Sequence, residues 1–107
     1  MKQFTNAEQT AKLIELGLDT PRNFFESLAF ADKSRCAYSI GELMEMLPMA
    51  IDKNKLEIWT PATWDEWGIS YGWHEYDEYH YLLHSANKEL IDALYDMILK
   101  LKEEGVI

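Results

Sequence analysis

One stretch of the sequence carries the residue pattern of a serine hydrolase. Gly68 to Gly72 matches the G-x-S-x-G nucleophile elbow, where a sharp turn from strand to helix exposes the serine beside an oxyanion hole. Asp77 and then His80 or His84 follow in the chain order that such hydrolases use. That fold brings its acid and base from distant strand ends, whereas these residues lie close together in the sequence and no helix pattern follows. The pattern therefore favours a strand interrupted by glycine, and no catalytic residue is predicted.

The three histidines, His74, His80 and His84, also lie close together in the sequence. On a helix, His80 and His84 would share one face, and His74 or a nearby carboxylate could complete a zinc site. The order of an H-E-x-x-H motif is missing, however, and the tyrosines between the histidines favour a strand. Surface or core-edge histidines are the favoured interpretation, so no metal and no cofactor is predicted. A pH-sensitive patch, in which acidic neighbours raise the imidazole pKa values, is a further alternative.

Two pairs of adjacent carboxylates, Asp65-Glu66 and Asp77-Glu78, could act as acid and base. Glycosidases place two carboxyl groups ~5 to 10 Å apart and raise the pKa of one of them by burial. Nothing in the sequence fixes such a separation, and acidic side chains are mostly solvated. The sequence therefore predicts a protein that is not an enzyme.

Aromatic residues are concentrated in the middle of the chain. Eight of the fourteen fall between Trp59 and Tyr81, and no basic residue occurs between Lys55 and Lys88. From residue 67 to 73 large side chains alternate with glycine and serine, which favours one buried aromatic face of a strand. The functional alternative is that some rings stay exposed and contact a protein partner, because amphipathic rings are enriched at interfaces. The candidate contact residues are Trp64, Trp73, Tyr76 and Tyr79.

Two helices are predicted in the first half of the chain. Thr5 to Glu8 reads as a capping box, and apolar residues at helical spacing predict a helix from about Asn6 to Leu16. A second capping box, Ser39 to Glu42, begins a helix of two turns that Pro48 ends. The segment 22–37 stays open between a short helix and an extended piece.

The second half of the chain predicts a hairpin followed by a long helix. Leu56 to Thr60 and Trp67 to Trp73 alternate in the manner of strands and are joined by a short turn. Leu90 to Leu101 has the clearest amphipathic pattern, with lysines in its last turns. Residues 74–86 stay open between helix and strand.

Length and composition limit the fold class. The 107 residues fit one domain, 1–107, and 48% hydrophobic content is enough to form a core. We expect an α+β fold, in which a short antiparallel sheet built on the hairpin is covered by an N-terminal and a C-terminal helix.

Charge and cysteine content limit the partners and the compartment. A formal net charge of -9 argues against direct binding of nucleic acid. No apolar run approaches the ~20 residues of a membrane span, and the first residues do not read as a signal peptide. The single cysteine, Cys36, cannot form an internal disulfide, so a reducing compartment is expected. We therefore predict a cytoplasmic protein that does not bind a membrane.

Three blocks of the sequence resemble a known family. These are Thr5 to Gly17 (TNAEQTAKLIELG), Tyr38 to Pro48 (YSIGELMEMLP) and Leu90 to Ile107 (LIDALYDMILKLKEEGVI). Together they are similar to a family of small uncharacterised bacterial proteins associated with phages and other mobile elements. That family has no assigned activity, so the resemblance implies an origin and no site residues.

The functional prediction is a non-enzymatic interaction or accessory protein of mobile-element origin with an unknown protein partner. One alternative is an anti-defence protein whose carboxylates imitate the phosphates of a nucleic acid and occupy a basic groove. Another alternative is a metal-binding or small-ligand-binding domain that uses the three histidines. The stripe from Leu90 to Leu101 could also form the seam of a homodimer.

Overall fold

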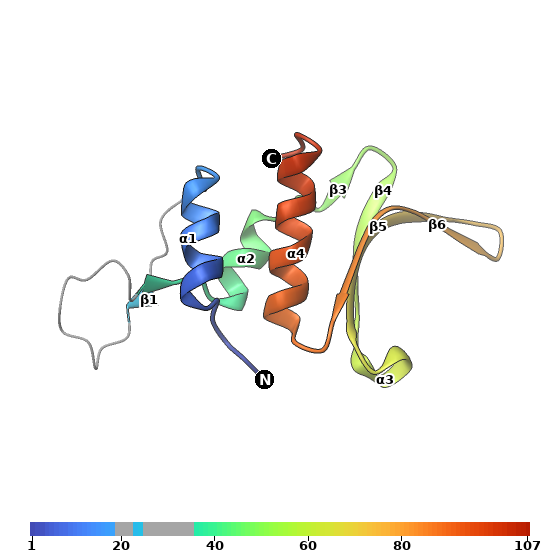
Figure 1. Ribbon diagram of the computed structural model, residues 1–107. Coiled ribbons are helices and arrows are strands. Elements are labelled where there is room, and N and C mark those ends of the chain that lie inside the picture. Colours follow the sequence, from blue (N-terminus) through green and yellow to red (C-terminus); the bar gives the residue numbers. More distant parts are fainter. Residues whose placement is uncertain (19–22, 25–35) are drawn as a thin grey trace.

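An antiparallel sheet forms one half of the fold. The computed structural model describes residues 1–18, 23–24 and 36–107 (Figure 1). The sheet has strand order β3-β4-β5-β6. Its strands are β3 (Ala50–Ile51), β4 (Asn54–Trp59), β5 (Trp67–Glu75) and β6 (Glu78–Asn87), all antiparallel to their neighbours. A separate two-residue pair joins β1 (Asn23–Phe24) to β2 (Cys36–Ala37), and the four-residue α3 (Pro61–Trp64) connects β4 to β5.

The predicted hairpin is confirmed. Strands β4 and β5 pair with Leu56 opposite Tyr71 and Ile58 opposite Ile69, so these β-branched, aromatic and aliphatic side chains share one face of the sheet. The segment that the sequence left open, residues 74–86, completes β5 and forms most of β6. His80 and His84 therefore lie on a strand, and the helix that would have placed them on one face is not formed.

The first helix, α1 (Ala7–Glu15), starts one residue later than expected, and its cap is likewise shifted by one residue. Asn6 is the N-cap: its side chain accepts the backbone N–H of Gln9 at 2.8 Å, and the Gln9 side chain accepts the backbone N–H of Asn6 at 3.0 Å. The capping box predicted from Thr5 to Glu8 is therefore wrong. Thr5 is buried instead, and its hydroxyl accepts the backbone N–H of Tyr38 at 3.0 Å. The buried hydroxyl thus ties the N-terminal segment to the residue that follows β2.

The second helix, α2 (Ile40–Met46), follows the sequence prediction closely. Ser39 accepts the backbone N–H of Glu42 at 3.1 Å and Glu42 accepts the backbone N–H of Ser39 at 3.2 Å, which is the predicted capping box. The helix stops because Leu47, which precedes Pro48, has the extended ψ of 125°.

The last helix, α4 (Leu90–Glu103), supplies half of the buried hydrophobic residues among those described. Its buried stripe faces the sheet side chains Ile69 and Tyr71, both of which are fully buried. The chain leaves the helix at Gly105, whose φ of 74° is the left-handed conformation that glycine adopts without strain. The buried residues of α4 are Leu90, Ile91, Ala93, Leu94, Met97, Ile98 and Leu101. The amphipathic helix predicted from Leu90 to Leu101 is confirmed, because its buried residues recur at helical spacing.

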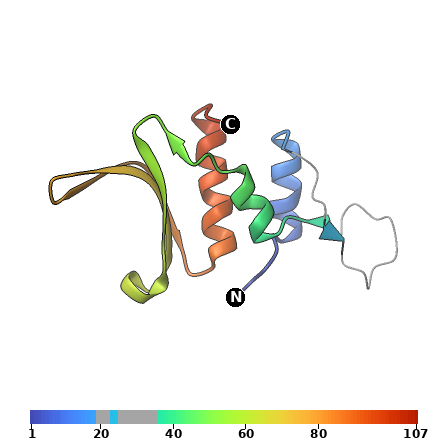
Figure 2. The same ribbon diagram turned by 180° about the vertical axis from the view of Figure 1, so that it is seen from behind.

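The elements form a layered α+β domain. Helix α4 packs against β5 and β6, and α2 packs against α4. Helix α1 lies beside α4 and α2 on the side away from the sheet (Figures 1 and 2), where Gln9 Nε2 donates to Asp92 Oδ1 at 2.8 Å. The opposite face of the sheet is not crossed by α1, α2 or α4 (Figure 2). Within the described ranges, no helix is both long and apolar enough to span a bilayer.

Candidate functional site

The open face of the sheet carries a distinct set of side chains. Strand register places Trp59, Gly68 and Ala86 side by side across β4, β5 and β6, and a second row contains Glu57, Ser70 and His84. Because side chains alternate along a strand, these residues point away from the buried Ile69 and Tyr71. The face that α4 leaves uncovered is therefore built from rings placed around small residues.

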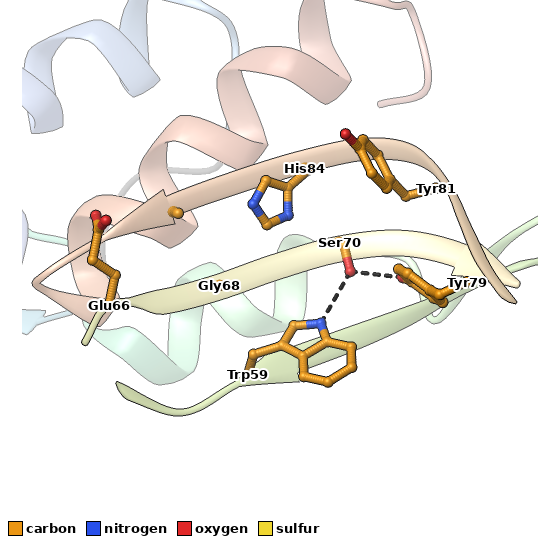
Figure 3. A pocket seen from close by; sticks show the side chains of 8 residues that line it. Trp59, Glu66, Gly68, Ser70, Tyr79, Tyr81 and His84 are labelled. Atoms are coloured by element: carbon orange, nitrogen blue, oxygen red, sulfur yellow. Dashed lines mark hydrogen bonds between the residues drawn. The ribbon is translucent and has the colours of Figure 1, made fainter. Parts of the chain in front are cut away.

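A groove of about 430 Å³ lies on this open face (Figure 3). Gly68 and Ser70 form its floor on β5, where neither residue projects a large side chain. Rings from β4 and β6 rise on either side of that floor, so the depth of the groove comes from the contrast in side-chain size. The lining residues are Trp59, Glu66, Gly68, Ser70, Tyr79, Tyr81, His84 and Ala86.

Four rings form a continuous wall around the groove, which we call the aromatic wall: Trp59, Tyr79, Tyr81 and His84. The Trp59 and Tyr79 centroids are 6.0 Å apart with an edge-to-face angle of 71°. The Tyr79 and Tyr81 centroids are 6.5 Å apart, and those of Tyr81 and His84 are 5.7 Å apart. Glu66 lies at the end of the groove opposite Tyr79 (Figure 3). The aromatic wall thus borders the groove on three sides, and the carboxylate of Glu66 borders the fourth.

Ser70 links two rings of the aromatic wall. Trp59 Nε1 donates to Ser70 Oγ at 3.3 Å, and Ser70 Oγ and Tyr79 Oη share a hydrogen bond of 2.7 Å (Figure 3). The serine is almost fully buried and lies in the middle of β5, with no turn into a helix after it. Its hydroxyl is hydrogen-bonded to an indole and a phenol, neither of which is the histidine base of a serine hydrolase. The interpretation of Gly68 to Gly72 as a glycine-interrupted strand is confirmed.

Gly72 allows Tyr79 to lie over the sheet. A Cβ at this position would clash with the backbone carbonyl oxygen of His80 and would lie 2.6 Å from Tyr79 Oη, so both the close approach of β6 and the position of the Tyr79 ring require glycine here. The register of β5 and β6 also shifts between Tyr71 and Gly72, so that Tyr81 pairs with Gly72 and Leu82 is the extra residue of a bulge. The missing side chain and the bulge together bring Tyr79 and Tyr81 to the same face as His84.

His74 and Glu57 form a small polar cluster next to Tyr79, on the side away from the groove. His74 Nε2 lies 3.1 Å from Glu57 Oε1, and the His74 and Tyr79 rings lie 4.8 Å apart. Burial raises the pKa of Tyr79; the Ser70 hydrogen bond lowers it, and the nearby Glu57 charge raises it further. The second oxygen of Glu57, Oε2, is buried without a hydrogen-bond partner among the described residues. Tyr79 is therefore a neutral phenol at neutral pH, beside a carboxylate.

The predicted contact residues are placed in different parts of the structure. Tyr79 lines the groove. Trp73 lies on the other face of the hairpin, where it stacks on His80 at 4.8 Å and Lys53 Nζ sits 4.0 Å from its ring centroid. Tyr76 is 97% exposed at the hairpin tip, with a φ of 56°. The side chain of Trp64 lies outside the described residues. Sequence reasoning thus selected one of the four rings of the aromatic wall.

The three predicted metal candidates do not converge. His74 lies on the open face, whereas the neighbouring strand pair of Trp73 and His80 lies on the opposite face. His80 Nε2 is 3.6 Å from Glu78 Oε2, and His84 is part of the aromatic wall. No group of three His, Cys, Asp or Glu residues that could hold a metal occurs in the part of the chain that the structure describes.

The two pairs of adjacent carboxylates, Asp65-Glu66 and Asp77-Glu78, lie at opposite ends of β5. Glu66 borders the groove, Asp65 follows α3 in a left-handed conformation with φ of 61°, and Asp77 lies in the turn at the hairpin tip. The open face therefore combines stacked rings, a glycine floor and a single carboxylate at its rim, an arrangement suited to binding.

No family model, no curated protein and no solved structure matches the chain.

Proposed function

We propose that this protein is a non-enzymatic interaction protein that receives a side chain of a protein partner in the groove on the open face of the sheet. The observation that carries the proposal is the uncovered aromatic wall above a floor of Gly68 and Ser70. Tyr81 is 63% exposed, although a buried tyrosine ring would contribute more to the core. Exposed aromatic rings around a concavity are typical of anchor sites at protein interfaces.

The chemistry of the groove favours binding over catalysis. An acid or base needs a titratable group that can reach a bound substrate, and a nucleophile needs a base next to it. Ser70 is hydrogen-bonded to two rings, and the carboxylate of Glu57 lies against His74. The remaining lining is apolar apart from Glu66 and His84. We infer that the groove binds a side chain of the partner and does not catalyse a reaction.

The wider setting of the proposal follows from the sequence. A single cysteine and a net charge of -9 agree with an acidic protein of the cytoplasm, and the resemblance to mobile-element proteins suggests an accessory role. Imitation of a nucleic acid by carboxylates remains a weaker proposal. Exposed acidic residues occur on α1, at the β5–β6 hairpin tip and at the end of α4, in addition to the groove rim. That distribution does not favour one phosphate-like track.

The test is a selection of random displayed peptides on the wild-type protein, followed by binding measurements with two tyrosine variants. Tyr81→Ala removes an exposed ring of the aromatic wall. Tyr76→Ala removes an exposed ring at the hairpin tip and is its matched control, because both side chains contribute little to the core. We expect selected peptides to lose at least about tenfold in affinity on Tyr81→Ala, as for an interface anchor, and to be unaffected by Tyr76→Ala.

Two outcomes would contradict the proposal. Peptides that depend on Tyr76 and ignore Tyr81 would place the contact surface at the hairpin tip. A selection that enriches no peptide sensitive to Tyr81→Ala would remove the groove as a protein-binding site. Circular dichroism of both variants establishes that the fold is retained.

A further inference from the structure

We propose that the side chain received by the groove is an arginine, presented by a basic segment of the partner. This inference rests on the proposed function and names the chemistry of the anchor. It follows from three features of the groove: the aromatic wall, the carboxylate at its open end, and the absence of lysine and arginine from the lining among the described residues.

The aromatic wall offers π faces to a cation. A guanidinium or ammonium group within ~6 Å of a ring centroid is attracted by the negative face of the ring, and several rings around one site add their contributions. Trp59, Tyr79 and Tyr81 supply two kinds of ring around one concavity. The planar guanidinium can also stack on these rings, which a compact ammonium group cannot do.

The charges around the groove favour a cation. Glu66 lies at the rim, and Glu57 lies directly behind Tyr79 with a buried oxygen that has no hydrogen-bond partner in the described part of the chain. None of the described lysines lines the groove. Lys55 lies on the open face opposite Gly72, two residues from Glu57, and Lys88 follows Asn87 at the end of β6. Lys53 lies over the Trp73 ring, and Lys100 Nζ donates to the carbonyl oxygen of His84. The charges that border the groove itself are therefore the carboxylates of Glu66 and, behind Tyr79, Glu57.

The shape and polarity of the groove favour arginine over lysine or a neutral side chain. The lining is mainly apolar, so a strongly hydrated ammonium group would lose water that the walls do not replace, whereas a guanidinium is weakly hydrated. A volume of about 430 Å³ is within the range of small-ligand pockets and accommodates a long side chain. A long side chain lying over Gly68 extends between Glu66 at one end of the groove and the rings of the aromatic wall, so its guanidinium is attracted by both. A neutral anchor would fill the same space without using the carboxylate.

The probe for this inference is N-acetyl-L-arginine methylamide, compared with its citrulline counterpart, in which a neutral urea of the same shape replaces the guanidinium. Binding is followed through the indole N–H signal of Trp59 in ¹⁵N-resolved NMR spectra, assigned by its loss in Trp59→Phe. This N–H donates to Ser70 at the groove floor. We expect the arginine probe to shift the signal and to bind at least about tenfold more tightly than the citrulline probe.

Variants of the full chain locate the binding. Glu66→Gln keeps the shape of the rim and is expected to weaken the arginine probe several-fold without changing the citrulline probe, because only the charged probe uses the carboxylate. Tyr81→Ala is expected to weaken the arginine probe, and Tyr76→Ala is expected to have no effect. Equal affinities for the two probes, or an unchanged Trp59 signal, would overturn the assignment. Tighter binding of tetramethylammonium would overturn it in favour of a free organic cation.

The failure of this inference can be told apart from the failure of the proposed function. If peptides selected on the protein depend on Tyr81 and the citrulline probe equals the arginine probe, the groove binds partners through a neutral anchor. If the arginine probe binds in the groove and no peptide depends on Tyr81, the inference that the groove binds arginine is supported, and the proposal that it binds a protein partner is contradicted. Support for both requires arginine-containing peptides whose affinity falls on replacement of that arginine by citrulline.

Discussion

Gly68 and Gly72 lie on the same face of β5 and differ in the space beside them. A Cβ on Gly68 would lie 3.4 Å from the Trp59 Cβ, an ordinary contact, whereas a Cβ on Gly72 would clash with the backbone carbonyl oxygen of His80 and lie 2.6 Å from Tyr79 Oη. We therefore expect Gly72→Ala to destabilise the protein by about 1 to 3 kcal/mol, since it pushes β6 away from β5 and displaces Tyr79 from Ser70. Gly68→Ala should leave stability unchanged or raise it by up to about 1 kcal/mol. Urea denaturation of the two variants measures the difference, and equal stabilities would refute the tight packing of β6 and Tyr79 against Gly72.

Tyr71 is a fully buried ionisable residue of the core. Burial raises the pKa of its phenol to about 12, and its hydroxyl donates to the carbonyl oxygen of Pro48 at 2.7 Å. An unfolded tyrosine has a pKa of about 10, so the stability supplied by the neutral phenol is complete below pH 10 and is lost as the pH rises toward about 12. Tyr71→Phe removes both the hydrogen bond and the titration. We expect the advantage of the wild type over this variant to shrink between pH 10 and pH 12 in urea denaturation; an advantage that stayed constant would contradict the raised pKa.

At the scale of the elements, the helix starts can be tested one cap at a time. Asn6 accepts the backbone N–H of Gln9 at the first turn of α1. We expect Asn6→Ala to cost about 1 kcal/mol of stability, the usual effect of losing an N-cap, and Asn6→Ser to restore most of it. Chemical denaturation followed by far-ultraviolet circular dichroism gives both values. An Asn6→Ala variant as stable as the wild type would show that another residue caps the helix.

Helices α1, α2 and α4 and the β4–β5 hairpin could be predicted from the sequence because their signals are local. Ser39 and Glu42 form the predicted capping box, and the buried stripe of α4 repeats with the period of a helix. The cap of α1 was misplaced by one residue because Thr5 and Asn6 are both good caps, and only tertiary structure draws the Thr5 hydroxyl into the contact with Tyr38. Local patterns therefore locate a helix well and decide less well between adjacent caps.

Strand β6 and the aromatic wall could not be predicted, and the bulge explains why. Before the register shift, Tyr79 and Tyr81 occupy the open face at odd positions; after it, His84 occupies the same face at an even position. The alternation that signals a strand is thereby broken within ten residues. The rings also come from two strands, β4 and β6, that are joined only through β5. No window of sequence contains that pairing.

At the scale of the molecule, the excess of carboxylates should lower stability at low ionic strength. The sequence has nineteen acidic and ten basic residues, so negative charges lie closer together in the folded state than in the unfolded chain. Raising the ionic strength from about 0.01 M to about 0.15 M shortens the Debye length from ~30 Å to ~8 Å. We expect the urea midpoint to rise over this range. An unchanged or lower midpoint would indicate that charge pairing outweighs the net repulsion.

The bond between Lys100 and the backbone of His84 has a consequence for how the protein behaves at high concentration. Strand β6 is an edge strand of the sheet, and an edge strand presents backbone groups with which a strand of another molecule can pair. The Lys100 ammonium occupies one of these acceptors, and the bulge at Leu82 bends the strand beside it. A strand of another molecule would have to displace Lys100 and pair with an edge strand that is bent at the bulge. Helix α4 thus both packs against the sheet and makes the addition of a strand from another molecule at this edge less favourable.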